Sequence, residues 1–290
     1  MTLVNPLPWI QRAQREQFAI GAFNANTLEQ VQAIALGAQA ENAPALIQIS
    51  HRALQHAGRG NATLGLRYMA AIGKIAAQSV AVPIGLHLDH ASKEEVLQAI
   101  TLGFTSVMFD GGDLPFGQNV ERTIQLRDMA HAVDVCLEAE IDEVPRADSR
   151  GKVEGEMTLT RPSDAAEFVR ATGVDTLAIA LGSVHAIKRK EVQIDLDRLK
   201  AIRLVVDVPL VLHGSSGVTD DHIAQGISLG LCKVNVATQL SQAFTSSVRA
   251  SLAADLQEVD PRQYLGPARD ALIERVRERI RFFGASGKAA

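Results

Sequence analysis

Residues 83–90 read PIGLHLDH, an apolar run that opens on a proline and ends on an aspartate and a histidine. A proline is tolerated at the first residue of a strand, where no ladder donor is missed. A nearly continuous apolar run is typical of a parallel strand that is covered on both faces. We therefore predict a buried parallel strand over 83–89, with Asp89 and His90 at its C-terminal end.

Seven further runs of this kind recur along the chain, and longer amphipathic segments lie between them. Several of these segments have polar starts typical of helices, such as Thr27 and Ser92 at capping-box spacing, Asp197 and Asp220. Eight strands joined by right-handed helical crossovers predict one (β/α)8 barrel, a TIM barrel, as a single domain over 1–290. The other strand candidates are 18–23, 44–50, 106–110, 135–141, 176–181, 209–214 and 233–236.

The repeating pattern breaks at two places. Residues 142–160 are rich in charged residues and glycine, and a loop of this length at the C-terminal mouth of the barrel is expected to form a lid. After a helix expected over 239–256, an extra helix within about 262–283 is predicted, with its amphipathic part over 267–283. Barrel closure does not need that helix, so we expect it to cap the barrel or to form an oligomer contact.

Composition excludes several classes of partner. The chain has 290 residues, 47% of them hydrophobic, and a formal net charge of −4. It therefore has no general attraction to nucleic acid or to an anionic membrane, and neither is expected as a partner. Its start lacks the charged and apolar regions of a signal peptide, and no apolar run is long enough to span a bilayer. Cys136 and Cys232 lie in apolar runs, as small buried residues of a reducing compartment do, so we expect a cytoplasmic protein.

Three histidines each follow a different predicted strand: His90, His185 and His213. The C-terminal ends of barrel strands meet at one mouth, so these imidazoles are expected to converge. Three protein ligands leave a fourth position open, which is typical of a catalytic zinc ion. Glu140 is a candidate further ligand or a partner that orients an imidazole, and for Asp110 we prefer the orienting role.

Asp89 precedes the first of these histidines directly. Adjacent strand residues point to opposite faces, so Asp89 and His90 both reach the mouth only if the strand bends there. A carboxyl group beside a bound metal could act as a general acid and base. The alternative is that Asp89 serves as the N-cap of the following helix.

Two segments after the seventh and eighth predicted strands suit a phosphate group. Residues 213–217 (HGSSG) form a Gly/Ser turn, and residues 233–238 (KVNVAT) lead from a strand into a helix. Backbone N–H groups at such turns and helix starts bind anions, and phosphate sites at these positions recur in this barrel type.

Taken together, the motifs resemble those of the class II, zinc-dependent ketose-bisphosphate aldolases over nearly the whole chain. This family contains the fructose- and tagatose-1,6-bisphosphate aldolases. The motifs are AFN (22–24), LHLDH (86–90), SVMFD (106–110), EAE (138–140), GSVH (182–185), LVLHGSSG (210–217), KVNVAT (233–238) and DPR (260–262).

The resemblance implies a role for each matching residue. Asp89 would move the proton of the ketose C4 hydroxyl, and Asn235 would position the enediolate. Arg262 would reach the far phosphate, often from the partner subunit, which implies a homodimer or homotetramer. The zinc ligands would be His90, His185 and His213; the phosphate of dihydroxyacetone phosphate would be held by Gly182, Gly214, Ser216 and Thr238; Ser50, and Asn24 of the first motif, would also belong to the substrate site.

The chain departs from the family pattern in the predicted lid and beside His185. The lid base that exchanges the C3 proton of the triose matches Glu154, with Glu143 and Glu156 as alternatives. Ala186 stands where the family has a glycine that lets backbone approach a ligand or monovalent cation. One zinc ion is therefore expected, and a second divalent or monovalent cation stays open.

The leading hypothesis is reversible cleavage of fructose or tagatose 1,6-bisphosphate to dihydroxyacetone phosphate and an aldehyde such as glyceraldehyde 3-phosphate. Lys233 begins its strand instead of ending it, which argues against an imine route. Alternatives are an aldolase for a phosphorylated deoxy-keto-gluconate and a sugar-phosphate-binding relative without turnover. A zinc hydrolase on the same barrel would need a His-x-His pair at the first strand, which residues 22–26 (AFNAN) lack.

Overall fold

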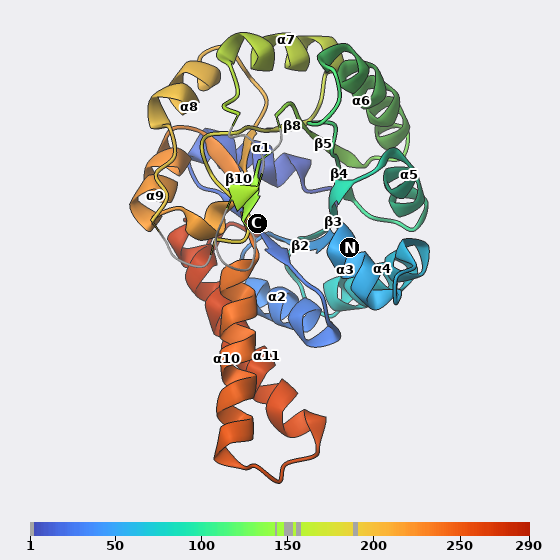
Figure 1. Cartoon of the computed structure of the whole chain (residues 1–290), viewed down its shortest axis with the longest axis vertical. Helices are drawn as coiled ribbons and strands as arrows, with labels where there is room; N and C mark the ends of the chain where they lie inside the picture. Colours follow the sequence, from blue (N-terminus) through green and yellow to red (C-terminus); the bar gives the residue numbers. More distant parts are fainter. Residues whose placement is uncertain (1–2, 143, 148–152, 155–157, 188–190) are drawn as a thin grey trace.

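Eight parallel strands close into a barrel, as predicted. The computed structural model describes residues 3–142, 144–147, 153–154, 158–187 and 191–290. The strands follow one another around the barrel in the order β1-β10-β9-β8-β5-β4-β3-β2, and the (β/α)8 prediction is confirmed (Figure 1). The barrel strands are β1 (Ile20–Asn24), β2 (Ala45–Ser50), β3 (Ile84–Ala91), β4 (Ser106–Phe109), β5 (Cys136–Glu140), β8 (Thr176–Ala178), β9 (Leu210–Leu212) and β10 (Leu231–Val236).

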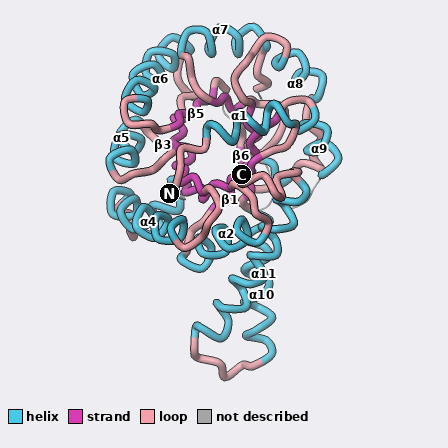
Figure 2. Tube along the Cα trace, turned by 180° about the vertical axis from the view of Figure 1, so that it is seen from behind, coloured by secondary structure: helices cyan, strands magenta, loops and turns pink. Residues whose placement is uncertain are grey.

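Helices surround this ring of strands (Figure 2). Their starts carry the predicted caps: Thr27 accepts a hydrogen bond from the Gln30 N–H, and Ser92 forms a full capping box with Glu95. The barrel helices are α2 (Leu28–Ala40), α3 (His51–Ala57), α4 (Ala62–Gln78), α5 (Lys93–Thr101), α6 (Phe116–His131), α7 (Pro162–Thr172), α8 (Leu196–Arg203), α9 (Asp220–Ser228) and α10 (Thr238–Ala254).

One predicted helix start is wrong by two residues. The N-cap of α8 is Asp195, whose side chain accepts a hydrogen bond from the Arg198 N–H, whereas Asp197 lies inside the first turn. Both aspartates suit a helix start, and the hydrogen bond that selects one of them forms only in the folded chain.

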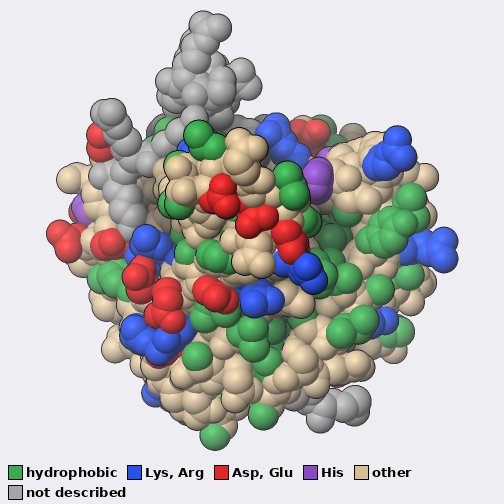
Figure 3. Space-filling model, turned by 90° about the horizontal axis from the view of Figure 1, so that it is seen from below, with side chains coloured by type: hydrophobic (Ala, Val, Ile, Leu, Met, Phe, Trp, Pro, Cys, Tyr) green, Lys and Arg blue, Asp and Glu red, His purple; other side chains and the backbone are tan. Residues whose placement is uncertain are grey.

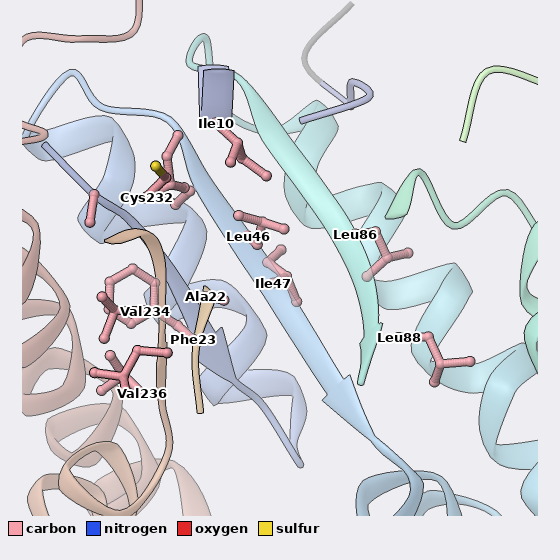
Figure 4. Close-up of a cluster of buried hydrophobic side chains, with 14 of the residues drawn as sticks. Ile10, Ala22, Phe23, Leu46, Ile47, Leu86, Leu88, Cys232, Val234 and Val236 are labelled. Carbon is pink, nitrogen blue, oxygen red and sulfur yellow. The ribbon is translucent and has the colours of Figure 1, made fainter. Parts of the chain in front are cut away.

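The N-terminal segment covers the end of the barrel opposite the mouth. Helix α1 (Leu7–Glu16) lies across this end in Figure 2, and the N–H of Val4 donates to the carbonyl of Ile84 at the start of β3. Its buried Ile10 belongs to the main hydrophobic cluster (Figure 4). The chain thereby closes the bottom of the barrel and leaves the opposite end for the site.

The two faces of the barrel strands differ in polarity. On β10, Val234 and Val236 are buried in the apolar layer between strands and helices, where they lie near Phe23 (Figure 4). The alternate residue Lys233 forms an ion pair with Glu138 of β5, which stands three strands away around the ring, so this contact passes through the barrel interior. The interior thus contains a charged pair that the apolar appearance of the strand runs did not indicate.

The predicted lid follows β5 and contains a short antiparallel ribbon. Strands β6 (Arg146–Ala147) and β7 (Val153–Glu154) pair Arg146 with Glu154 and Ala147 with Val153. The ribbon lies between β5 and α7, inside the 142–160 segment for which a lid loop, and no strand, was predicted.

The predicted extra helix exists at the C-terminal end of the chain. Helix α11 runs from Pro261 to Phe282, within one residue of the predicted 262–283, because Asp260 caps it and Pro261 occupies its first turn. It pairs with α10 in a hairpin that projects from the barrel, and it returns to pack against α2 (Figure 1). Viewed from the hairpin end, acidic and basic side chains are interspersed with scattered hydrophobic ones (Figure 3).

The hairpin ends in exposed apolar side chains. Leu256 is 83% exposed and Val259 is 88% exposed at its tip. None of the helices in the described part of the chain has the length and apolar character that a membrane span requires.

Candidate active site and metal centre

The three predicted histidines converge at the mouth of the barrel. The ring centroid of His90 lies 4.8 Å from that of His213 and 5.1 Å from that of His185. His213 Nδ1 lies 3.1 Å from His90 Nε2. Two imidazole nitrogens on one tetrahedral zinc ion would be about 3.4 Å apart, because each bond is about 2.0–2.1 Å long. The described chain therefore offers three imidazoles at metal-binding spacing.

Strand β3 bends where the sequence argument required it. The pairing of β3 with β4 is irregular between Leu88 and Ala91, and His90 has a left-handed φ of 49°. This bend lets Asp89 and His90 line the same cavity although they are adjacent in sequence. Ser92 caps helix α5, so the alternative role of Asp89 as that N-cap is wrong.

Two carboxylates orient the histidines. Asp110 Oδ2 lies 2.8 Å from His90 Nδ1, and Glu138 Oε1 lies 3.0 Å from His213 Nε2. Each contact engages one ring nitrogen and leaves the other to face the cluster. Asp110 thus occupies the orienting position, and Glu138 is a residue that the sequence argument missed. The sequence did contain a signal for Glu138: it lies two residues before Glu140 on β5, so both side chains are on the same face of the strand and point to the interior.

Glu140 supplies an observation that favours a bound cation. Its side chain is buried, and neither carboxylate oxygen has a hydrogen-bond partner among the described residues. The two oxygens lie 3.9 Å from His90 Nδ1 and 3.7 Å from His213 Nδ1. Burial raises the pKa of Glu140 well above its usual range, and a cation at the cluster would oppose that shift. The donor set of imidazole nitrogens and carboxylate oxygens fits zinc.

The pKa of Asp89 is shifted in the opposite direction from that of Glu140. Burial alone would raise the pKa of Asp89, but the neighbouring His90, His213 and Lys233 lower it below the usual value. Asn235 Nδ2 also donates a hydrogen bond to Asp89 Oδ1 at 3.2 Å. Asp89 is therefore held as a carboxylate at the cavity wall.

A cavity of about 530 Å³ opens at this mouth. Most predicted substrate residues line it, together with Gln48, His51 and Arg52, which the sequence argument did not single out. Gln48 is tied to the predicted set because its amide donates to Asn24 Oδ1 at 3.0 Å. The predicted residues on the cavity wall are Asn24, Ser50, Asp89, His90, His185, Gly214, Ser216, Asn235 and Thr238.

Gly182 and Arg262 are not among the described residues that line this cavity. Gly182 follows β8 with a φ of 90° and is not on the described wall. Arg262 is 87% exposed at the start of α11, where it forms an ion pair with Asp260 at 2.7 Å, so its own subunit does not bring it to the mouth. For Glu154 only its place in β7 is described, while Glu143 and Glu156 lie outside the described residues.

Comparison with known proteins identifies the family. The family described as "Fructose-bisphosphate aldolase class-II" matches residues 4–288. The chain belongs to this family. A fructose-bisphosphate aldolase from Geobacillus stearothermophilus is 39% identical over 291 residues, covering 100% of both chains. The crystal structure of the YdjI aldolase from Escherichia coli K12 superposes with a TM-score of 0.85 at 30% identity, covering 99% of this chain and 100% of that one.

The chain is therefore an enzyme, a carbon–carbon lyase of the class II aldolase family, as the motifs predicted. The backbone at Ala186 has an unusual conformation. Ala186 of this aldolase lines the cavity with a φ of 65°, a left-handed conformation that suits glycine better than alanine. Ala186 thus places a methyl group at a cavity position whose backbone conformation glycine adopts more readily.

Proposed function

We propose that this aldolase reversibly cleaves a ketose 1,6-bisphosphate, fructose or tagatose 1,6-bisphosphate, to dihydroxyacetone phosphate and glyceraldehyde 3-phosphate. The observation that carries the proposal is the convergence of His90, His185 and His213 beside the Asp89–Asn235 pair. The name of the Geobacillus relative, fructose-bisphosphate aldolase, supports the choice of substrate class.

Zinc is the proposed cofactor. His90, His185 and His213 would hold it, with Glu140 as a further or exchanging ligand. When bound, it would supply Lewis-acid polarisation of the substrate carbonyl oxygen, which stabilises the charge left by C–C cleavage. Asp110 and Glu138 orient two of the imidazoles for this purpose.

The remaining steps belong to the side chains of the mouth. Asp89 is proposed to take the proton from the C4 hydroxyl during cleavage and to return it during condensation. Asn235 would hold Asp89 in place and position the enediolate. Glu154 is the proposed base for the C3 proton of the triose.

The phosphate of the triose is proposed to bind beside β9 and β10. Gly214, Ser216 and Thr238 line the cavity there, and Gly214 has the φ of 63° that a tight turn requires. Backbone N–H groups and hydroxyls can hold a phosphate at such turns, and Gly182, in the segment after β8, is proposed as a further contact.

Assembly and location complete the proposal. Arg262 lies on the projecting hairpin, so its contribution to a substrate site would have to come from a partner subunit, which favours a homodimer or homotetramer. Leu256 and Val259 at the hairpin tip are exposed apolar side chains that such a contact would remove from water. We also propose a single catalytic domain and a cytoplasmic location, the latter supported by the buried free thiols Cys136 and Cys232.

The test is a cleavage assay with purified protein and a panel of phosphorylated ketoses, in which release of dihydroxyacetone phosphate is followed. We expect release that a chelator abolishes and added zinc restores, fastest with fructose or tagatose 1,6-bisphosphate. Faster cleavage of a phosphorylated deoxy-keto-gluconate, with release of a three-carbon acid, would make that compound the substrate instead of a ketose 1,6-bisphosphate. Tight binding of every ketose without release would replace the enzyme proposal by a binding function, while activity that survives complete metal removal would contradict zinc dependence.

A further inference from the structure

Arg52 stands on the cavity wall close to the proposed proton-transfer residue. Strand β2 ends at Ser50, which is the register partner of Asp89 on β3. Helix α3 follows at once, so Arg52 lies two residues beyond Ser50 and lines the same cavity. The part of the substrate beyond C4 must extend from Asp89 toward one of the neighbouring strands. Ser50 and Arg52 line the cavity on the side of β2.

The proposed triose-phosphate site lies elsewhere around the mouth. Gly214 and Ser216 follow β9, and strands β10 and β1 separate β9 from β2 in the ring. A ketose 1,6-bisphosphate carries its two phosphates at opposite ends of a six-carbon chain. With the first phosphate beside β9 and the C4 hydroxyl at Asp89 on β3, the second phosphate lies past Asp89, beside one of the two strands that flank β3, either β2 or β4.

Arg52 differs in charge from most of the other residues that line the cavity. Among the described lining residues it is the only arginine or lysine, whereas Asp89 and Asp110 are carboxylates. Its neighbour His51 is already engaged, because His51 Nδ1 lies 2.6 Å from Glu95 Oε1. No described carboxylate forms an ion pair with Arg52, so its guanidinium is available to an anion.

We propose that Arg52 binds the phosphate at the far end of the substrate, from the same subunit whose zinc site cleaves it. A guanidinium matches the geometry of a phosphate and can donate two parallel hydrogen bonds to it. Arg52 is thus a specificity-determining residue that favours bisphosphates over monophosphates. This inference rests on the proposed function and adds to it an anion contact within the subunit, independent of Arg262.

The experiment compares the kcat/KM for fructose 1,6-bisphosphate with that for fructose 1-phosphate, which lacks the far phosphate. Their ratio isolates the contribution of that phosphate. Wild type, Arg52→Gln and Arg67→Gln are measured; Arg67 is an exposed arginine of α4 outside the cavity and serves as the matched control. Because Arg52 is itself exposed, Arg52→Gln is expected to melt at the wild-type temperature.

We expect Arg52→Gln to lower the ratio at least tenfold, mainly through KM for the bisphosphate, while kcat/KM for fructose 1-phosphate changes less than twofold. Arg67→Gln should keep the wild-type ratio. An unchanged ratio in Arg52→Gln, or an equal loss for both substrates, overturns the role of Arg52 and leaves the proposed function standing. A wild-type enzyme that cleaves both substrates equally well also overturns it. A wild type that cleaves neither of these substrates nor tagatose 1,6-bisphosphate refutes the proposed function itself, and the inference with it.

Discussion

Asn235 donates a hydrogen bond from its Nδ2 to Asp89 Oδ1 at 3.2 Å, joining β10 to β3 across the mouth of the barrel. The two strands are separated by β1 and β2 in the ring, so the contact spans the opening. The other amide atom, Asn235 Oδ1, is buried and has no hydrogen-bond partner among the described residues. Asn235 therefore orients Asp89 with one atom and has the other available for a substrate hydroxyl.

The first prediction concerns the proton role of Asp89. Asp89→Ala should lose about 10²–10⁴-fold in the cleavage rate, because positioned acid–base catalysis contributes on that order. The variant should still bind zinc, since the three histidines and Glu140 are unchanged. Parallel measurement of kcat and of bound zinc checks this. Wild-type turnover in a folded Asp89→Ala protein would remove the assigned role.

A second prediction concerns the buried ion pair in the barrel interior. Lys233 Nζ lies 3.0 Å from Glu138, and both side chains are almost fully buried. Burial would raise the pKa of Glu138, but Lys233 and His213 lower it below its usual range. Lys233→Met should lower the free energy of unfolding by about 3–5 kcal/mol, because it leaves a buried carboxylate uncompensated.

Urea unfolding measures that loss, and the double variant Lys233→Met/Glu138→Gln provides the control. It should recover part of the stability, since it removes the stranded charge. Its zinc affinity should nevertheless fall about 10–100-fold, because His213 loses the carboxylate that orients it. A loss below about 1 kcal/mol in the single variant would show that the pair is not what stabilises the interior.

The third prediction tests the backbone at Ala186. Its φ of 65° costs an alanine about 1–2 kcal/mol, and glycine avoids that cost but loses about 0.4–1 kcal/mol of chain entropy on folding. Ala186→Gly should therefore raise the melting temperature slightly. The matched substitution Ala271→Gly, inside helix α11, should lower it. If both substitutions destabilise equally, the left-handed conformation is not under strain.

The fourth prediction is a pH dependence of stability. The carboxylate of Glu41 accepts hydrogen bonds from Arg277, Arg281 and Ser286, tying the end of α2 to the C-terminal segment. Burial would raise the pKa of Glu41, but these donors lower it from 4.5 to about 2. A lowered pKa in the folded state means that the contribution is complete above pH 4.5 and is lost as the pH falls toward 2.

Urea unfolding of wild type and Glu41→Gln at several pH values checks this. The wild type should be more stable by about 2 kcal/mol at pH 7, allowing for solvent screening, and the two proteins should converge near pH 2. Other carboxylates titrate in both proteins, so the difference reports on Glu41. A difference that does not change with pH would show that the charge of Glu41 contributes nothing.

The fifth prediction addresses the base on the β6–β7 ribbon. Glu154→Ala should slow the exchange of the C3 proton of dihydroxyacetone phosphate with solvent, since its proposed role is to remove that proton. Exchange is followed by NMR in deuterated water without any aldehyde present. Glu143→Ala and Glu156→Ala are the comparison variants, and whichever of the three slows exchange most identifies the base.

Much of the fold was predictable because local patterns agreed with it. Apolar runs marked all eight strands. His90 and His213 lie at the ends of β3 and β9, whereas β8 ends at Ala178, earlier than the predicted 181, and His185 lies in the segment that follows it. Where two residues were equally suited to a role, the sequence could not choose, as with Asp195 and Asp197 at the start of α8. The start of α11 was predictable, because the Asp260-Pro261 pair combines an N-cap residue with a proline in the first turn.

The amino-acid sequence by itself determined the barrel, the histidine set and the family, because strand periodicity, helix caps and motif residues act over short stretches of chain. Only the tertiary structure decided that Lys233 pairs with Glu138, that β3 bends at His90, and that Arg52 is the one basic side chain other than histidine among the described residues of the cavity wall. Each of these depends on which strands become neighbours across a closed ring. Residues 95 or 146 positions apart in sequence, such as Glu138 and Lys233 or Asp89 and Asn235, meet only when the barrel closes.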